Sequence, residues 1–202
     1  MPRYEPGVAL IVVDVQNDFA DPKGTLGVHG CDAVIAAINI EVAAARAGRA
    51  MVVCSQDWHP SRTPHFKRDG GPWPAHCVVD TWGAELHPAL EIPTGTPMVR
   101  KGSNGEDGYS AFSMRDPGSG AMVPTMLQPL LQAAGVKRVV IAGVATDYCV
   151  KHTALDAVRL GFDTTVLTDA VAAVDVQPGD GDRALAELAA AGAHLVPSTG
   201  KA

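Results

Sequence analysis

The stretch "RVVIAGVATDYCVKHTALDAVRLG" (residues 138–161) decides how this chain folds, because it joins a strand to a helix. Its apolar start, 138–144, predicts a buried strand, and the spacing over 148–160 predicts an amphipathic helix. Cys149 is expected in the first turn of that helix. The stretch therefore predicts a strand–helix unit with a cysteine just beyond the carboxyl end of the strand.

The same alternation extends in both directions along the chain. The run "GVALIVVDV" (7–15) is continuously apolar and β-branched, which is typical of a strand buried on both faces. Alternating strands and helices predict an α/β fold with a parallel sheet and right-handed crossovers. Further strands are expected at 50–56, 97–102, 163–170 and 194–197, and further helices at 31–49, 125–135 and 182–192.

The bulk composition limits the possible functions. The 202 residues carry a net charge of -6, with 47% hydrophobic and 19% charged residues. This favours one globular domain spanning 1–202 and argues against nucleic-acid or membrane partners. We find no signal-peptide pattern, and the four cysteines lack a CxxC spacing. We therefore expect a cytoplasmic protein with free thiols.

Polar residues gather where the predicted strands end. Asp14 ends the first strand, Asp57 follows the second, Lys101 ends the third and Cys149 follows the fourth. Sites of open α/β sheets collect at the carboxyl ends of strands. We therefore expect these four side chains at one rim of the sheet.

An acid, a cation and a thiol at this rim favour a thiol hydrolase. The positive end of a helix stabilises a thiolate at Cys149, and Asp14 is placed to take the thiol proton. The alternatives are a buried inert cysteine, a carboxylate bonded to loop backbone and a solvated lysine. Cys31, Cys54 and Cys77 are interpreted as structural.

A second cluster lies in the long expected loop, 57–97. Asp57 and His59 share one face if the chain is extended, and His65 and His76 can fold back toward them. One carboxylate and three imidazoles suit zinc, iron or manganese. The alternative is a set of surface histidines. We assign no role to His29, His87, His152 and His194.

Five segments in this order resemble the nicotinamidase/pyrazinamidase branch of the isochorismatase-like cysteine hydrolases. They are "VDVQNDF" (13–19), "DWHP" (57–60), "WPAHCV" (73–78), "KG" followed by "DGYSAF" (101–112), and "GVATDYCV" (143–150). The resemblance covers nearly the whole chain. It implies a three-layer α/β/α fold with a six-stranded, mostly parallel sheet, and a possible homo-oligomer.

The resemblance also implies roles for individual residues. Asp14, Lys101 and Cys149 correspond to a catalytic triad. A divalent ion, zinc before iron or manganese, is bound by Asp57, His59, His65 and His76. A cis peptide joins Val144 to Ala145, and the N–H groups of Ala145 and Cys149 form the oxyanion hole. Phe19 and Trp73 sandwich a pyridine ring.

The implied reaction converts nicotinamide to nicotinate and ammonia through a thioester, in NAD salvage, with pyrazinamide as a further substrate. His29 and the Gly-rich loop 102–108 depart from the family pattern, and we expect both at the rim of the pocket. The alternatives are an amidase acting on a carbamoyl or ureido compound, and a non-catalytic metal-binding or thiol-sensing protein.

Overall fold

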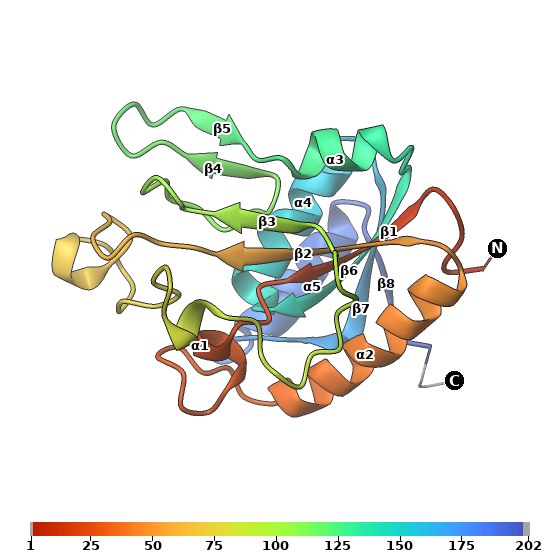
Figure 1. Cartoon of the computed structure of the whole chain (residues 1–202), viewed down its shortest axis with the longest axis horizontal. Helices are drawn as coiled ribbons and strands as arrows, with labels where there is room; N and C mark the ends of the chain where they lie inside the picture. Colours follow the sequence, from red (N-terminus) through yellow and green to blue (C-terminus); the bar gives the residue numbers. More distant parts are fainter. Residues whose placement is uncertain (1, 200–202) are drawn as a thin grey trace.

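The computed structural model describes residues 2–199, and six parallel strands form its centre (Figure 1). The strands lie in the order β3-β2-β1-β6-β7-β8. This confirms the predicted parallel α/β fold. Their bounds are Val8–Val13 for β1, Met51–Asp57 for β2, Met98–Lys101 for β3, Arg138–Val144 for β6, Asp163–Ala172 for β7 and His194–Val196 for β8.

Strand β1 lies in the middle of the sheet and pairs in parallel with β2 on one side and β6 on the other. All six of its residues are buried. Leu10 and Val12 pack on one face, whereas Ala9 and Ile11 pack on the other. A strand buried on both faces needs apolar residues at every position, which explains its unbroken hydrophobic run.

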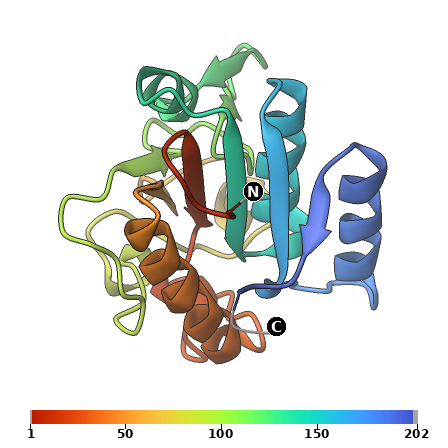
Figure 2. The same cartoon turned by 90° about the vertical axis from the view of Figure 1, so that its right-hand side faces the viewer.

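Helices cover both faces of the sheet and give the three-layer architecture (Figure 2). Helix α2 (Cys31–Ala47) packs on the first face, through residues such as Ile38. The opposite face is covered by α3 (Leu127–Ala133), α4 (Lys151–Arg159) and α5 (Asp180–Ala190). Among residues 2–199, no helix combines the length and the apolar character that crossing a bilayer requires.

Three local features differ from the sequence-based prediction. A short helix, α1 (Asn17–Ala20), follows β1, and a small antiparallel hairpin of β4 (Ser113–Arg115) and β5 (Met122–Pro124) lies between β3 and α3, where no strands were predicted. Elements of three or four residues are too short to carry a periodic signal. The helical backbone around Cys149 begins as a π-helical turn, Thr146–Val150, two residues before the predicted start.

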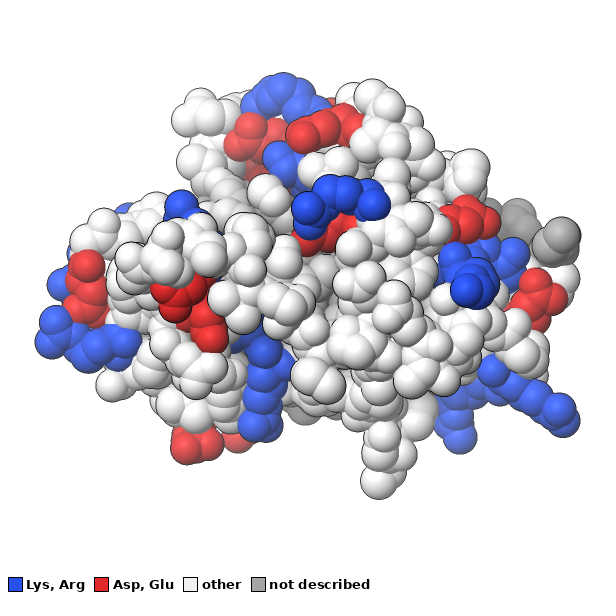
Figure 3. Space-filling view, turned by 90° about the horizontal axis from the view of Figure 1, so that it is seen from above, with Lys and Arg blue, Asp and Glu red and all other residues white. Residues whose placement is uncertain are grey.

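The segment between β2 and β3 is long and mostly irregular, as expected. It contains two single turns of 3₁₀-helix, η1 (Lys67–Asp69) and η2 (Trp82–Ala84). In the view of Figure 3, basic and acidic side chains are interspersed over the visible face, without a continuous basic patch among the described residues. This charge pattern gives no support to a nucleic-acid surface there.

Candidate active site

The parallel sheet brings the predicted polar residues together at one rim. Asp14 directly follows β1, Asp57 and Lys101 end the paired strands β2 and β3, and Cys149 lies in the turn after β6. All four side chains are buried. Because parallel strands all end on the same side, residues 135 positions apart in the chain become neighbours.

Lys101 is the centre of this group. Its Nζ lies 2.7 Å from Asp14 Oδ2 and 2.7 Å from Asp57 Oδ1. The same ammonium group donates to the Tyr109 carbonyl at 3.1 Å and lies 3.6 Å from Cys149 Sγ. The alternative of a solvated lysine is therefore wrong: the ammonium is fully buried and joins two carboxylates to the thiol.

Burial and neighbouring charges shift the pKa values in this group. Burial raises the pKa of the Cys149 thiol well above its ordinary range, although the Lys101 charge acts in the opposite direction. Burial also raises the pKa of Asp14, against the pull of Lys101. Burial alone would lower the pKa of Lys101, but Asp14 and Asp57 together raise it well above its ordinary value. The resting state therefore contains a neutral thiol and a charged lysine.

Asp14 is held in place by a residue that the sequence analysis missed. Ser55 Oγ donates to Asp14 Oδ1 at 2.7 Å, and Asp14 itself has a φ of 50°. Ser55 lies inside β2, so its pairing with Asp14 follows from the neighbouring positions of the two strands. The serine leaves Oδ2 for Lys101 and fixes the direction of the carboxylate.

Cys149 lines a pocket above this group, whereas the other three cysteines are buried elsewhere. Val144 and Ala145 line the same pocket, and the peptide between them is cis, as the resemblance implies. The pocket holds about 390 Å³ of empty space, including its open mouth. That size suits a small molecule.

The walls of the pocket are aromatic. Phe19 and Trp73 line it as expected, together with Tyr109 and Tyr148, to which the sequence analysis assigned no role. Trp73 Nε1 donates to Tyr109 Oη at 3.0 Å, and the Trp73 and Tyr148 rings meet edge to face with centroids 5.0 Å apart. Flat apolar walls of this kind favour a planar ring.

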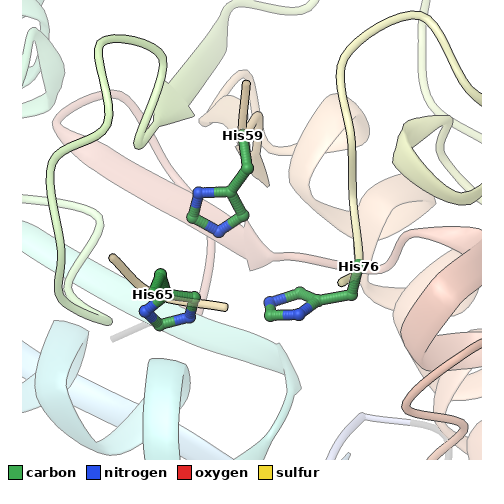
Figure 4. Close-up of side chains that lie close together, drawn as sticks. All are labelled: His59, His65 and His76. Atoms are coloured by element: carbon green, nitrogen blue, oxygen red, sulfur yellow. The ribbon is translucent and has the colours of Figure 1, made fainter. Parts of the chain in front are cut away.

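The three predicted histidine ligands converge beside the pocket. His59, His65 and His76 are buried, and one ring nitrogen of each lies within 4.8 Å of the others. Figure 4 shows the three rings turned toward a common space. Asp57 Oδ2 completes the set, since it lies 3.7 Å from His59 Nε2 and 3.8 Å from His76 Nε2.

Two buried atoms indicate that this cluster fits a cation. Neither ring nitrogen of His59 has a hydrogen-bond partner among the described residues, although the side chain is fully buried. Unpartnered buried polar groups are costly, and a metal ion would satisfy a lone pair of the ring. Three imidazoles and one carboxylate are a donor set suited to a divalent metal ion.

The two departures from the family pattern lie in different places. His29 is exposed and is not among the residues that line the pocket. Loop 102–108 contacts the histidine cluster instead of forming the pocket wall. Its Gly102 lies against the His59 ring, and its Asp107 Oδ1 lies 2.6 Å from His65 Nδ1.

Comparisons with known proteins agree with this geometry. Residues 8–199 match the family model described as "Isochorismatase domain". The chain is 37% identical over 206 residues to the nicotinamidase of Escherichia coli strain K12, with 94% of each chain covered.

Two solved structures are similar in fold and sequence. The pyrazinamidase of Pyrococcus horikoshii in complex with zinc has a TM-score of 0.84 at 40% identity, covering 95% of this chain and 99% of the other. PnC1 from L. infantum in complex with nicotinate has a TM-score of 0.86 at 38% identity, covering 98% and 96%. With its family match over almost the whole length, this chain belongs to the isochorismatase-domain family, in the branch that contains the nicotinamidases and pyrazinamidases.

Proposed function

We propose that this protein is a nicotinamidase, which hydrolyses nicotinamide to nicotinate and ammonia and thereby serves NAD salvage. The observation that carries the proposal is the meeting of Cys149, Lys101 and Asp14 at the base of an aromatic pocket. The similar nicotinamidase of Escherichia coli and the similar structure with bound nicotinate support it. Pyrazinamide is a further expected substrate, because its ring has the same shape.

Acylation begins with the neutral thiol. Asp14, whose pKa is raised by burial, takes the proton of Cys149 as the sulfur attacks the amide carbon. Lys101, 3.6 Å from the sulfur, offsets the developing negative charge. Asp14 then gives the proton to the leaving amine. Ammonia departs, and the carbon–nitrogen bond is replaced by a thioester.

Deacylation uses the same carboxylate in the same order. Asp14 takes a proton from water as the water oxygen attacks the thioester carbon, and the carbon–sulfur bond breaks. The proton returns to the departing thiolate, which restores the neutral thiol and releases nicotinate. We assign the oxyanion hole of both steps to the N–H groups of Ala145 and Cys149, beside the pocket. Such donors contribute roughly 3–4 kcal/mol in other enzymes.

The aromatic walls of the pocket bind the ring of the substrate. We place it between Phe19 and Trp73, which hold a planar heteroaromatic ring and exclude water from the thiol. Asp57, His59, His65 and His76 would hold the metal ion, for which zinc is our first choice given the zinc-containing relative. When bound, the ion supplies Lewis-acid character that orients a ring nitrogen.

The direct test is ammonia release from nicotinamide, pyrazinamide and a ureido compound under identical conditions. We expect turnover of the two ring amides and at least tenfold lower kcat/KM for the ureido compound. The opposite preference would assign the protein to another amidase activity of the superfamily. Release of ammonia from none of the three would favour a non-catalytic protein.

Elemental analysis and chelation test the metal site. One four-residue ligand set predicts about one equivalent of metal per chain. We expect chelation to lower activity on nicotinamide more than it lowers Tm, and readdition of zinc to restore activity. Full activity and unchanged KM in metal-free protein would leave the cluster with a structural role alone.

A further inference from the structure

The three histidines of the cluster differ in the hydrogen-bond partner of the Nδ1 atom of each ring. His65 Nδ1 lies 2.6 Å from Asp107 Oδ1, and His76 Nδ1 lies 2.7 Å from the Pro74 carbonyl oxygen. His59 has no such partner among the described residues. Of the three rings, therefore, His65 is the one backed by a carboxylate.

Asp107 is itself held from several directions. Its backbone exchanges two hydrogen bonds with Arg115 of β4, at 2.8 and 2.6 Å. Arg115 Nη2 also donates to Asp107 Oδ2 at 2.6 Å, and Gly108 N donates to Oδ1 at 2.9 Å. With its main chain paired and both oxygens bonded, the carboxylate presents Oδ1 to His65 in one fixed direction.

This arrangement determines where the proton of His65 lies. The Asp107 carboxylate accepts hydrogen bonds from Arg115 and Gly108, so it acts as an acceptor toward His65 as well. Nδ1 of His65 therefore carries the hydrogen, and Nε2 keeps its lone pair. A neutral ring with this tautomer can ligate a metal through Nε2 alone.

We propose that Asp107 is a positioning residue of the metal site, which fixes the tautomer and orientation of His65 and thereby raises the affinity for the divalent ion. Arg115 acts one step further out, by holding Asp107. The proposal rests on the proposed function, because it takes Asp57 and the three histidines as the metal ligands. Carboxylates in this position change metal affinity by about 10–100-fold in other proteins.

The experiment compares metal-free wild type with Asp107→Asn and Glu106→Gln. Glu106 is a matched control, since it is the neighbouring carboxylate of the same loop but bonds to Asn104. Zinc affinity is measured by competition with a chelator of known strength, and the Tm of each metal-free protein is measured in parallel. We expect Asp107→Asn to bind zinc about 10–100-fold more weakly, with a metal-free Tm close to wild type. Glu106→Gln should match wild type in both.

The outcomes distinguish a failure of the proposed role of Asp107 from a failure of the proposed metal site. Wild-type affinity in Asp107→Asn would overturn the role of Asp107 while leaving the metal site intact. Failure of the wild type to bind zinc would refute the metal site and this role with it. If Asp107→Asn does not fold, ¹⁵N NMR of metal-free wild type decides: His65 should show the Nδ1–H tautomer, and an Nε2–H tautomer would overturn the proposal.

Discussion

At the scale of single residues, the most consequential side chain is Lys101. A buried ammonium group is costly unless it is paired, and here it is paired with Asp14 and Asp57. The Asp14 pair belongs to the proposed thiol chemistry, and the Asp57 pair belongs to the proposed set of metal ligands. One lysine thus links the two halves of the site, and the charge of either half bears on the other.

The thiol gives the first prediction. Cys149→Ala should lower ammonia release by about 10⁴-fold or more, because the described residues that line the pocket include no other cysteine and no serine. Tm should change by less than about 3 °C, roughly 1 kcal/mol for a chain of this size. Enzyme assays and thermal melts of the purified variant check both values.

Alkylation gives an independent measure of the same residue. Iodoacetamide should label Cys149 first, since Cys31, Cys54 and Cys77 are buried away from the pocket. Mass spectrometry of partly labelled protein identifies the modified site. Equal labelling of Cys149 and Cys54 would argue against a specially accessible thiol.

Lys101 gives the second prediction, which concerns how the rate of Cys149 alkylation depends on pH. Its positive charge lowers the pKa of Cys149, against the larger raising effect of burial. Lys101→Gln removes that charge, so the thiol pKa rises and less thiolate exists at any fixed pH. The rate of alkylation at neutral pH should fall about tenfold for each unit of rise, and the pH profile should move to higher pH. A profile identical to wild type would remove Lys101 from this role.

At the scale of elements, loop 102–108 lies against the histidine cluster, whereas the sequence analysis expected it at the rim of the pocket. It follows β3 and brings Gly102 against His59, whereas Asp107 contacts His65. Its backbone returns to β4 through the pairing of Asp107 with Arg115. The β4–β5 hairpin, which the sequence did not predict, therefore supports the histidine cluster from outside the six-stranded sheet.

Two glycines of this loop form a matched pair for a third prediction. Gly102 and Gly105 have φ values of 76° and 84°, so alanine should cost about 1–2 kcal/mol at either position. A Cβ at Gly102 would lie 2.5 Å from His59 Nδ1, whereas a Cβ at Gly105 meets no atom within 4 Å. Gly102→Ala should therefore displace a metal ligand, and Gly105→Ala should not.

Chelator competition and thermal melts distinguish the two effects. Gly102→Ala should lose at least as much Tm as Gly105→Ala, because the buried His59 ring must also shift, and only Gly102→Ala should lose zinc affinity, by at least about tenfold. The same zinc affinity in Gly102→Ala and Gly105→Ala would show that His59 tolerates the added methyl group. The position of His59 as a zinc ligand would then not depend on the contact with Gly102.

At the scale of the whole molecule, a buried carboxylate ties both ends of the chain to α2. Glu41 accepts hydrogen bonds from Tyr4 Oη at 2.5 Å, Arg3 Nη1 at 2.7 Å and Thr199 Oγ1 at 2.7 Å. Its side chain is fully buried. None of these residues lines the pocket, so we expect this cluster to stabilise the fold without affecting the reaction.

Glu41→Gln tests that separation. Loss of the charge should cost about 1–3 kcal/mol, because hydrogen bonds to charged groups are among the stronger ones, and should lower Tm by several degrees. The kcat/KM on nicotinamide should stay at the wild-type value below the melting range. Glu187→Gln is the control, since its exposed pair with Lys151 should contribute little. A fall in kcat/KM at full folding would connect the chain ends to the site.

Much of the architecture could be predicted from the sequence because burial leaves a local pattern. The apolar run of β1 and the strand before Cys149 both require a parallel sheet with two covered faces. Once that sheet is inferred, Asp14, Lys101 and Cys149 are expected at the same rim, because Asp14 follows β1, Lys101 ends β3 and Cys149 lies in the turn after β6. The histidine cluster could likewise be expected from its spacing in the long loop.

Other features were decided by the tertiary structure alone. Ser55 reaches Asp14 across neighbouring strands, and Asp107 reaches His65 from 42 positions away. The loop after β3 folds back over the Lys101 ammonium group, so that Lys101 donates to the Tyr109 carbonyl. This fold of the loop is why Lys101 is buried and not solvated. Which strands form, and roughly where they end, can be inferred from the sequence, since hydrophobic periodicity is local. The hydrogen-bond partner of each polar side chain depends on the conformation of the loops. Loop conformation leaves no periodic pattern in the sequence.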